Sequence, residues 1–274
     1  MKVAVAQFEP GWDKKANLEH IALLAGKAGR DGARVVVFPE GAMHTFGENS
    51  DDLRAAAEPL DGPFVETLSR LAARLDLTVV AGMFETIPGD DLIANTAIVV
   101  GPQRGLVASH RKVHLYDAFG ELESERFRAG TSGVPLVEID GFKAAFVVCY
   151  ELRFPAFIQD AADRGADMLL VPAAWVAGPL KEEHWNLMVR ARAVENTMFV
   201  AAAGMTGAGY CGRSMIVDPL GVVIAGLAEG EGVAVGEVTA ERLAHARARL
   251  PLVEQRRALA EQRRASSHAP ATRR

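Results

Sequence analysis

Glu40, Lys112 and Cys149 each follow a run of residues that is typical of a β-strand. The three runs are Arg34–Phe38, Arg104–Ser109 and Lys143–Val148. Binding crevices in layered α/β proteins open where strands end, so we expect these reactive side chains to meet. Taken singly, they have plainer interpretations as a capping or surface carboxylate, a solvated lysine and a small buried thiol. Their occurrence together favours a chemical role.

These residue types are sufficient for acyl transfer. A thiolate attacks carbonyl carbons readily, and Cys149 precedes a helix start at Pro155, where backbone N–H groups can lower a thiol pKa. A carboxylate such as Glu40 can accept the thiol proton, return it to the leaving amine and later activate water. Lys112 and the backbone N–H of Tyr150 can stabilise the oxyanion that forms during attack. The sequence therefore predicts a thiol hydrolase.

Short strands alternate with amphipathic helices along most of the chain, which predicts a layered α/β fold. Further strands are expected at Lys2–Phe8, Thr78–Phe84, Ile93–Val100, Met168–Val171, Met198–Ala203, Arg213–Val217, Val222–Ala225 and Gly232–Val238. Helices are expected from Asp13, over Pro63–Leu75, over about Pro155–Arg164 and over Glu182–Asn196. The segment Arg111–Gly130 has neither pattern and is expected to be a long loop, and loops of that length usually have a function.

The composition is that of an ordinary globular chain of 274 residues, with a net charge of −5. That charge argues against nucleic-acid binding, because a nucleic-acid-binding protein usually has a basic surface. Two cysteines outside any CxxC pair argue against a disulfide scaffold and a cysteine-rich zinc site. His110 and His114 flank Arg111 and Lys112, whose charges would repel a metal cation. We expect neither a metal nor an organic cofactor.

The chain offers no segment that we interpret as a signal peptide or a membrane span. The apolar run at the N-terminus is too short for a signal peptide, and the nearly apolar run Met168–Ala177 is too short to cross a bilayer. We therefore expect a cytoplasmic protein without a membrane partner. Residues 1–250 show no dividing linker and are expected to form a single domain. Residues 251–274, with six arginines and two glutamates, are expected to form a solvated or dimer-strapping tail, helical to about Arg264 and disordered beyond.

Three motifs resemble the catalytic motifs of the nitrilase superfamily of carbon–nitrogen hydrolases. They are Phe38-Pro39-Glu40, His110-Arg111-Lys112-Val113-His114-Leu115 and Cys149-Tyr150-Glu151-Leu152-Arg153-Phe154-Pro155, in the order and at the separations usual in that family. Arg190–Asn196 and Gly212–Gly221 extend the resemblance, which covers about residues 1–245. The resemblance implies a catalytic triad of Glu40, Lys112 and Cys149. It also implies a four-layer α-β-β-α sandwich that pairs through its helices into an eight-layer dimer.

The same family often has a second active-site glutamate after the lysine. Counting back from Gly130 favours Glu123 for this role, with Glu121 and Glu125 as close competitors. The family also commonly has glutamate where this chain has Ala156. That difference lies past the nucleophile, so it concerns a helix contact and not the chemistry.

Four further residues are candidates for the substrate pocket, each with a structural alternative. They are Tyr116, Arg153, Trp175 and His184. Arg153 could bind a substrate carboxylate, although an arginine at a helix start more often joins loops through salt bridges. Cys211 lies in a glycine-rich segment, and we expect no role for it.

The predicted reaction is hydrolysis of a small linear amide to an acid and ammonia through a thioester. The short chain and the Asp218-Pro219 turn look most like the omega-amidase and deaminated-glutathione-amidase branch. Hydrolysis of N-carbamoyl compounds is the alternative. Nitrile hydrolysis is disfavoured, because nitrilases are typically longer and often carry tryptophan at the position of Tyr150. A non-enzymatic scaffold and a redox sensor built on Cys149 and Cys211 are the alternatives from other classes.

Overall fold

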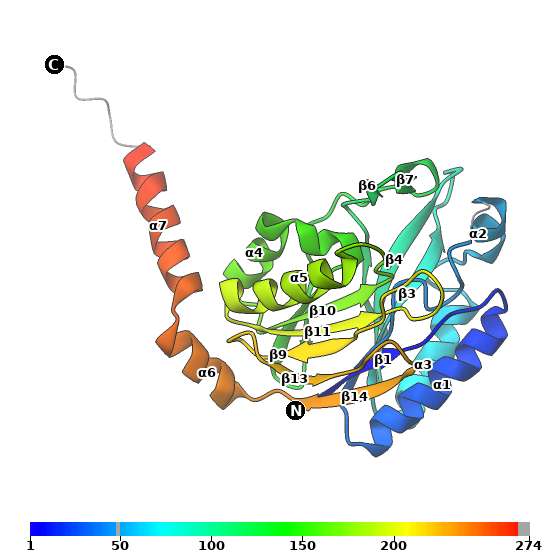
Figure 1. The fold of residues 1–274 in the computed structure, drawn as a ribbon, viewed down its shortest axis with the longest axis horizontal. Helices are drawn as coiled ribbons and strands as arrows, with labels where there is room; N and C mark the ends of the chain where they lie inside the picture. The colour runs from blue at the N-terminus through cyan, green and yellow to red at the C-terminus, as the bar shows by residue number, and fades with distance from the viewer. Residues whose placement is uncertain (48–49, 268–274) are drawn as a thin grey trace.

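Two six-stranded β-sheets face each other in the computed structural model, which describes residues 1–47 and 50–267 (Figure 1). Helices cover the outer face of each sheet, so the layers follow the order α-β-β-α (Figure 1). This is the four-layer sandwich predicted from the sequence, and the predicted fold class is confirmed. Pairing of two such chains into an eight-layer dimer stays a prediction.

The first sheet has the order β14-β1-β2-β3-β4-β5. In chain order its strands are β1 (Lys2–Gln7), β2 (Val35–Val37), β3 (Thr78–Thr86), β4 (Ile93–Gly101), β5 (Gly105–Arg111) and β14 (Gly232–Glu237). Strands β1, β2 and β3 run parallel, with Val3 beside Val35 and Val35 beside Thr78. The β3–β4, β4–β5 and β1–β14 pairs are antiparallel. Central β2 consists of three buried valines, as expected for a strand covered on both faces.

The second sheet has the order β13-β12-β11-β10-β9-β8. Its strands are β8 (Leu136–Ile139), β9 (Phe142–Phe146), β10 (Met168–Ala173), β11 (Phe199–Gly204), β12 (Met215–Val217) and β13 (Val223–Gly226). Strands β9, β10 and β11 run parallel, with Ala144 beside Met168 and Met168 beside Phe199. In each sheet the parallel strands therefore end at one end of the sandwich, where the loops after β2 and β9 begin.

The outer layers are amphipathic helices. Helix α1 (Lys14–Arg30) begins after Asp13, whose carboxylate accepts hydrogen bonds from the first backbone N–H groups of the helix. Helix α3 (Pro63–Leu75) has proline in its first turn, where the missing N–H has no helical partner to lose. These two helices pack on the first sheet, and α4 (Pro155–Asp163) and α5 (Lys181–Asn196) pack on the second (Figure 1).

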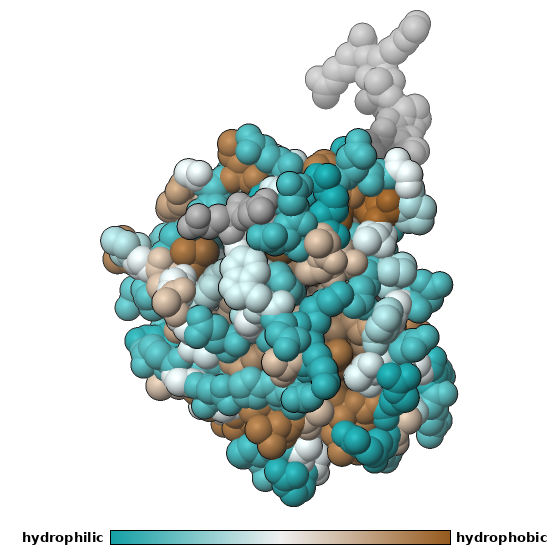
Figure 2. Space-filling view, turned by 90° about the vertical axis from the view of Figure 1, so that its right-hand side faces the viewer, coloured by the Kyte–Doolittle hydropathy of each residue, from teal (hydrophilic) through white to brown (hydrophobic). Residues whose placement is uncertain are grey.

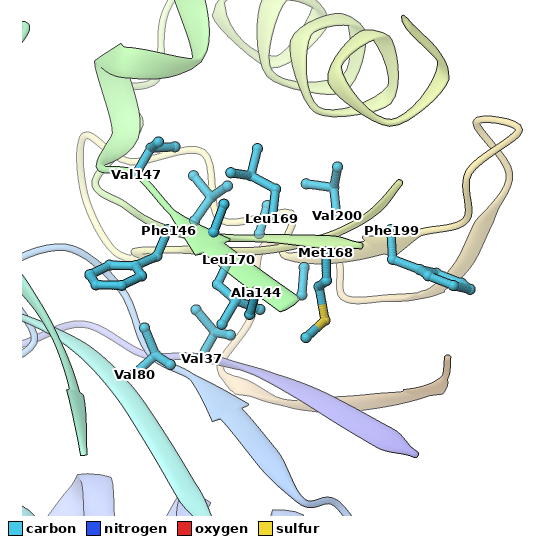
Figure 3. Packing of buried hydrophobic residues seen from close by; sticks show 14 of the residues in the cluster. Val37, Val80, Ala144, Phe146, Val147, Met168, Leu169, Leu170, Phe199 and Val200 are labelled. Carbon is cyan, nitrogen blue, oxygen red and sulfur yellow. The ribbon is translucent and has the colours of Figure 1, made fainter. Parts of the chain in front are cut away.

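The space between the sheets is filled by apolar side chains. Val37 and Val80 of the first sheet face the second sheet around Ala144, Phe146 and Leu170 (Figure 3). All five side chains are fully buried. Burial of apolar area stabilises the fold by about 25 cal/mol per Å². This packing fixes the two sheets relative to each other, and with them the loops at their ends.

Several elements were not expected from the sequence. They are β8, the short helix α2 (Ser50–Ala56), the helix α6 (Ala240–Arg249), and the hairpin of β6 (Asp117–Ala118) and β7 (Glu121–Leu122) inside the expected loop. Helix α7 (Leu252–Ser267) begins against α4, where Arg256 pairs with Asp163, and then extends away from the sandwich (Figure 1). It continues past Arg264, so the predicted helix end is wrong. The disorder expected for residues 268–274 lies outside the described residues.

Hydrophilic residues cover most of the face shown in Figure 2, and hydrophobic residues appear there as separate patches. Among residues 1–47 and 50–267, no helix combines the length and hydropathy that crossing a membrane requires.

Candidate active site

The ends of three strands bring Glu40, Lys112 and Cys149 into one buried cluster. Glu40 follows β2, Lys112 follows β5 directly, and Cys149 follows β9 of the opposite sheet. The Nζ atom of Lys112 lies 2.8 Å from Oε1 of Glu40, and Cys149 lies in the same cavity wall as both side chains. Glu40 and Lys112 are each 2 % exposed. The structure therefore assembles the three side chains that the sequence singled out.

Close backbone approach holds Glu40 in place. Its Oε2 atom accepts a hydrogen bond of 2.8 Å from the backbone N–H of Ala174, at the end of β10. Gly82 of β3 passes directly beside it, and a Cβ atom at this position would lie 2.6 Å from the Cα atom of Glu40. Glycine is required at this point because any side chain would displace the carboxylate.

Cys149 lies at a sharp turn between β9 and the 3-10 helix Cys149–Arg153. Its φ angle is 45°, a conformation that costs energy for a residue with a Cβ atom. Glu151 joins this turn to the segment that follows Lys112, because its carboxylate accepts 2.7 Å hydrogen bonds from both Val148 N–H and Val113 N–H. It also lies 2.9 Å from Nε2 of His110. This fully buried carboxylate thus connects the Cys149 turn to the Lys112 segment.

Glu123 reaches the cluster from the 3-10 helix Glu123–Glu125. Its two carboxylate oxygens lie 2.8 Å and 3.1 Å from Lys112 Nζ, and the Tyr116 N–H donates to it at 2.6 Å. Glu121 and Glu125 line the neighbouring cavity. Of the three glutamates that the sequence left open, Glu123 makes the contact with Lys112.

Asn95 joins the cluster from β4, the strand next to the edge strand β5 of the first sheet. Its Nδ2 atom donates to Oε1 of Glu40 at 2.7 Å and to Oε1 of Glu123 at 2.9 Å. The sequence analysis missed this residue. The available signal in the sequence was the adjacent polar pair Asn95-Thr96 inside an otherwise apolar strand. Both residues are buried, so a position at the surface does not explain their polarity.

Burial and the neighbouring charges shift the pKa values of Lys112 and Cys149. Burial would lower the pKa of Lys112, but the carboxylates of Glu123 and Glu40 outweigh it and hold that pKa well above its ordinary value. Burial and the Glu40 charge raise the pKa of the Cys149 thiol well above its ordinary value, although Lys112 acts against them. The thiol pKa expected from a helix start was a lowered one, and that expectation is wrong. Desolvation and the adjacent carboxylate outweigh the backbone N–H groups.

A cavity of about 710 Å³ opens onto the cluster. Cys149, Glu40, Lys112 and Glu123 lie in its wall, together with Tyr210, whose pKa is raised to about 12 by burial and the nearby Glu40 charge. A volume of this size accommodates a small organic molecule.

Three cationic side chains line the cavity without forming an ion pair to any carboxylate in the part of the chain that the structure describes. They are Arg126, Arg153 and Lys181. The Nε atoms of both arginines are buried and have no hydrogen-bond partner among the described residues. Lys181 Nζ donates to the Tyr116 hydroxyl at 2.8 Å, and burial lowers the pKa of Lys181. A partly buried cation without a counter-ion has lost some of its hydration, so this wall is suited to an anionic ligand.

The four pocket candidates from the sequence lie at or near this wall. Tyr116, Arg153 and Trp175 line the cavity, and the Arg153 guanidinium lies 4.6 Å from the Trp175 ring centroid. His184 lies behind Arg153, with its Nδ1 atom 3.4 Å from the guanidinium. Tyr150 follows Cys149 in the cavity wall. Sequence reasoning missed Lys181 and Arg126, which have no motif of their own.

Cys149 and Cys211 are both free thiols. Burial raises the pKa of Cys211 to about 12, and its thiol donates to the carbonyl oxygen of Gly212 instead of a carboxylate that could take its proton. Across residues 1–47 and 50–267, no group of three or more histidine, cysteine, aspartate or glutamate side chains is arranged to hold a metal ion.

Comparisons with known proteins agree with this geometry. The family described as carbon-nitrogen hydrolase matches residues 2–248. The deaminated glutathione amidase of Escherichia coli O157:H7 is 38 % identical over 259 residues, which cover 94 % of this chain and 97 % of that protein. The chloroplastic omega-amidase of Arabidopsis thaliana is 33 % identical over 272 residues, covering 93 % of this chain and 72 % of that protein.

Solved structures extend the agreement to the fold. Nit3 of Saccharomyces cerevisiae, described as a member of branch 10 of the nitrilase superfamily, has a TM-score of 0.84 and 29 % sequence identity. The aligned region covers 94 % of this chain and 96 % of that one. The chain belongs to the carbon-nitrogen hydrolase family of the nitrilase superfamily and is a hydrolase that acts on carbon–nitrogen bonds.

Proposed function

We propose that the chain is a cysteine-dependent amidase that hydrolyses a small linear amide whose acyl part carries a carboxylate. The observation that carries this proposal is the buried Glu40–Lys112–Cys149 cluster in the wall of the 710 Å³ cavity. The relatives named deaminated glutathione amidase and omega-amidase support an amide as the substrate.

The first half-reaction is transfer of the acyl group to sulfur. The raised thiol pKa means that Cys149 is protonated at neutral pH, so Glu40 removes the proton as the sulfur attacks the amide carbon. The carbonyl π electrons move to oxygen, and Lys112 with the Tyr150 N–H stabilises the resulting oxyanion. The carbon–nitrogen bond then breaks, the nitrogen takes the proton from Glu40, and ammonia leaves behind a thioester.

The second half-reaction is hydrolysis of that thioester. Glu40, again ionised, removes a proton from water while the water oxygen attacks the thioester carbon. The carbon–sulfur bond breaks, the sulfur regains the proton from Glu40, and the acid is released. Glu123 holds the Lys112 ammonium in place through both half-reactions, because it contacts that ammonium with two oxygens.

The cationic wall supports the substrate class. Arg153 and Lys181 lie in the same cavity as Cys149 and have no carboxylate partner among the described residues. A substrate carboxylate would accept hydrogen bonds from them and supply the missing counter-charge. A small linear amide with a free carboxylate at its far end has this arrangement of groups.

N-carbamoyl amino acids are the second candidate class, because they also place a carboxylate beyond a cleavable carbon–nitrogen bond. The cationic wall suits both classes, and their products separate them. An amide yields one ammonia and an acid, whereas an N-carbamoyl compound also yields carbon dioxide.

Ammonia release from succinamate, butyramide and N-carbamoyl-β-alanine tests the proposal. We expect kcat/KM for succinamate to exceed that for butyramide by about 10- to 100-fold, which corresponds to a charged hydrogen bond of about 1.5–3 kcal/mol. Arg153→Met should remove that preference chiefly through KM, while Arg128→Met, whose arginine pairs with Asp90 outside the cavity, should keep it. Cys149→Ala should abolish turnover. Full activity of Cys149→Ala, or equal rates with succinamate and butyramide, would contradict the proposal.

A further inference from the structure

Asn95 and Lys112 donate to the same two carboxylate oxygens. Asn95 Nδ2 lies 2.7 Å from Glu40 Oε1 and 2.9 Å from Glu123 Oε1. Lys112 Nζ lies 2.8 Å and 3.1 Å from the same atoms. The four side chains therefore form a closed ring, in which one amide and one ammonium separate two carboxylates.

The orientation of the Asn95 amide follows from this ring. Its Oδ1 atom is buried and has no hydrogen-bond partner among the described residues. Rotation of the amide by 180° would aim Oδ1 at both carboxylate oxygens, and their repulsion would oppose it. An unsatisfied buried oxygen is uncommon in proteins and calls for an explanation. Here the explanation is that both amide hydrogens are committed to the carboxylates.

The charge balance around the ring makes this donation important. Lys112 is the ammonium that contacts both Glu40 and Glu123, so one positive charge faces two negative charges. Two carboxylates that share a site tend to retain a proton between them. A hydrogen bond to the charged form opposes this, and an amide supplies it without adding a second positive charge. The other ionisable groups near these carboxylates are Cys149, Tyr210, Arg126 and Glu121.

We propose that Asn95 is a positioning residue that keeps Glu40 ionised, and therefore able to accept the Cys149 proton, by donating one amide hydrogen to each of the two active-site carboxylates. The inference rests on the proposed function, because it takes Glu40 as the base for Cys149. Asn95 does not reach the substrate. It acts through Glu40 and Glu123, and it leaves the charge of Lys112 available to the oxyanion.

The test follows alkylation of Cys149 by iodoacetamide between pH 4 and pH 9, measured by peptide mass spectrometry so that Cys211 is scored separately. Ionised Glu40 accepts the thiol proton as the sulfur–carbon bond forms and iodide leaves, so the rate falls at low pH when the carboxylates take up a proton. In Asn95→Ala we expect the midpoint of this low-pH step to move up by about one pH unit. The alkylation rate on the acid side then falls about 10-fold. The same displacement is expected in kcat/KM for the amide substrate.

Two variants guard against an effect of folding alone. Thr96→Val alters the adjacent buried residue of β4, whose hydroxyl hydrogen-bonds at 2.7 Å to Glu85 outside the ring, and it should keep the wild-type midpoint. Asn95→Ser retains one donor at the position and should give a smaller displacement than Asn95→Ala. If Asn95→Ala does not fold, the serine variant decides the question through its own midpoint.

A double-variant cycle separates positioning from general disruption. In a Glu123→Gln background one carboxylate charge is absent but Asn95 still donates to Glu40, so Asn95→Ala should move the midpoint by less than it does in the wild type. A rate that falls equally at every pH, with the wild-type midpoint, would overturn the inference and leave Asn95 as a packing residue. Turnover that survives in Cys149→Ala would instead overturn the proposed function. The two failures are therefore distinguishable.

Discussion

Replacement of Glu151 by glutamine should damage both stability and turnover, although Glu151 touches no proposed reacting atom. Its carboxylate is fully buried and accepts hydrogen bonds from Val148 N–H, Val113 N–H and the His110 ring. A glutamine can present its oxygen to the Val113 side only by turning its NH₂ group toward Val148 N–H and His110. One buried N–H then loses its acceptor and meets another donor.

The magnitude follows from these contacts. An unsatisfied buried polar group costs about 1–3 kcal/mol, and a donor–donor contact adds to this, so we expect a loss of about 2–4 kcal/mol. For a chain of this size, each kcal/mol shifts Tm by about 2–4 °C, so Tm should fall by about 5–15 °C. The kcat value should fall more than KM rises, because the Cys149 turn, held at a φ angle of 45°, is then free to relax.

Thermal unfolding and steady-state kinetics of Glu151→Gln check this, with Glu138→Gln as the matched control. Glu138 is an exposed glutamate in the middle of β8, so its loss should change stability by less than about 0.5 kcal/mol. If Glu151→Gln behaves like Glu138→Gln in both measurements, the carboxylate does not hold the nucleophile turn and the reasoning is wrong.

Two more outcomes follow from the site. Glu123→Gln should lower kcat by at least about 10-fold, because Lys112 loses one of its two carboxylate partners. The control Glu125→Gln should leave kcat within about twofold. Equal effects of the two substitutions would reject Glu123 as the second carboxylate. Because the pKa of the folded Cys149 thiol is raised, folding favours the protonated thiol, so the stability from this group is present below the pKa of the unfolded thiol and is lost as pH rises above it. Urea unfolding from pH 7 to pH 10 should therefore show a loss of stability above about pH 8.5 that is smaller in Cys149→Ser, and equal pH dependence in the two proteins would contradict it.

The sequence predicted the layered fold because its strands carry a strong local signal. The three valines of β2 and the apolar runs of β9 and β10 read as strands from composition alone, and Asp13 and Pro63 mark helix starts. The hairpin β6–β7 was not predicted, because two-residue strands have no periodicity to detect. Helix α2 carries three charged residues in seven and packs only part of one face, so its apolar pattern is too short to recognise.

The residues of the site can likewise be divided into those that the sequence predicted and those that it missed. Glu40, Lys112 and Cys149 were found because each stands at a strand end within a motif. Asn95, Lys181 and Arg126 reach the site from a strand interior, a helix start and a loop, so their proximity is a product of tertiary structure. The direction of the thiol pKa also depended on tertiary structure, since burial and the distance to Glu40 cannot be read from the position of one cysteine.

The raised pKa of the Cys149 thiol favours, for the proposed reaction, proton removal coupled to attack over a preformed thiolate. A preformed thiolate would place a third negative charge beside Glu40 and Glu123, with Lys112 as the ammonium in contact with both carboxylates. Burial makes that state costly, so the thiol keeps its proton until a substrate carbonyl is present to accept the electron pair. Proton removal and attack are then coupled, and the charge on sulfur passes to an oxyanion that Lys112 can stabilise. Under the proposed function, Cys149 therefore becomes a nucleophile only through the ring of Glu40, Lys112, Glu123 and Asn95.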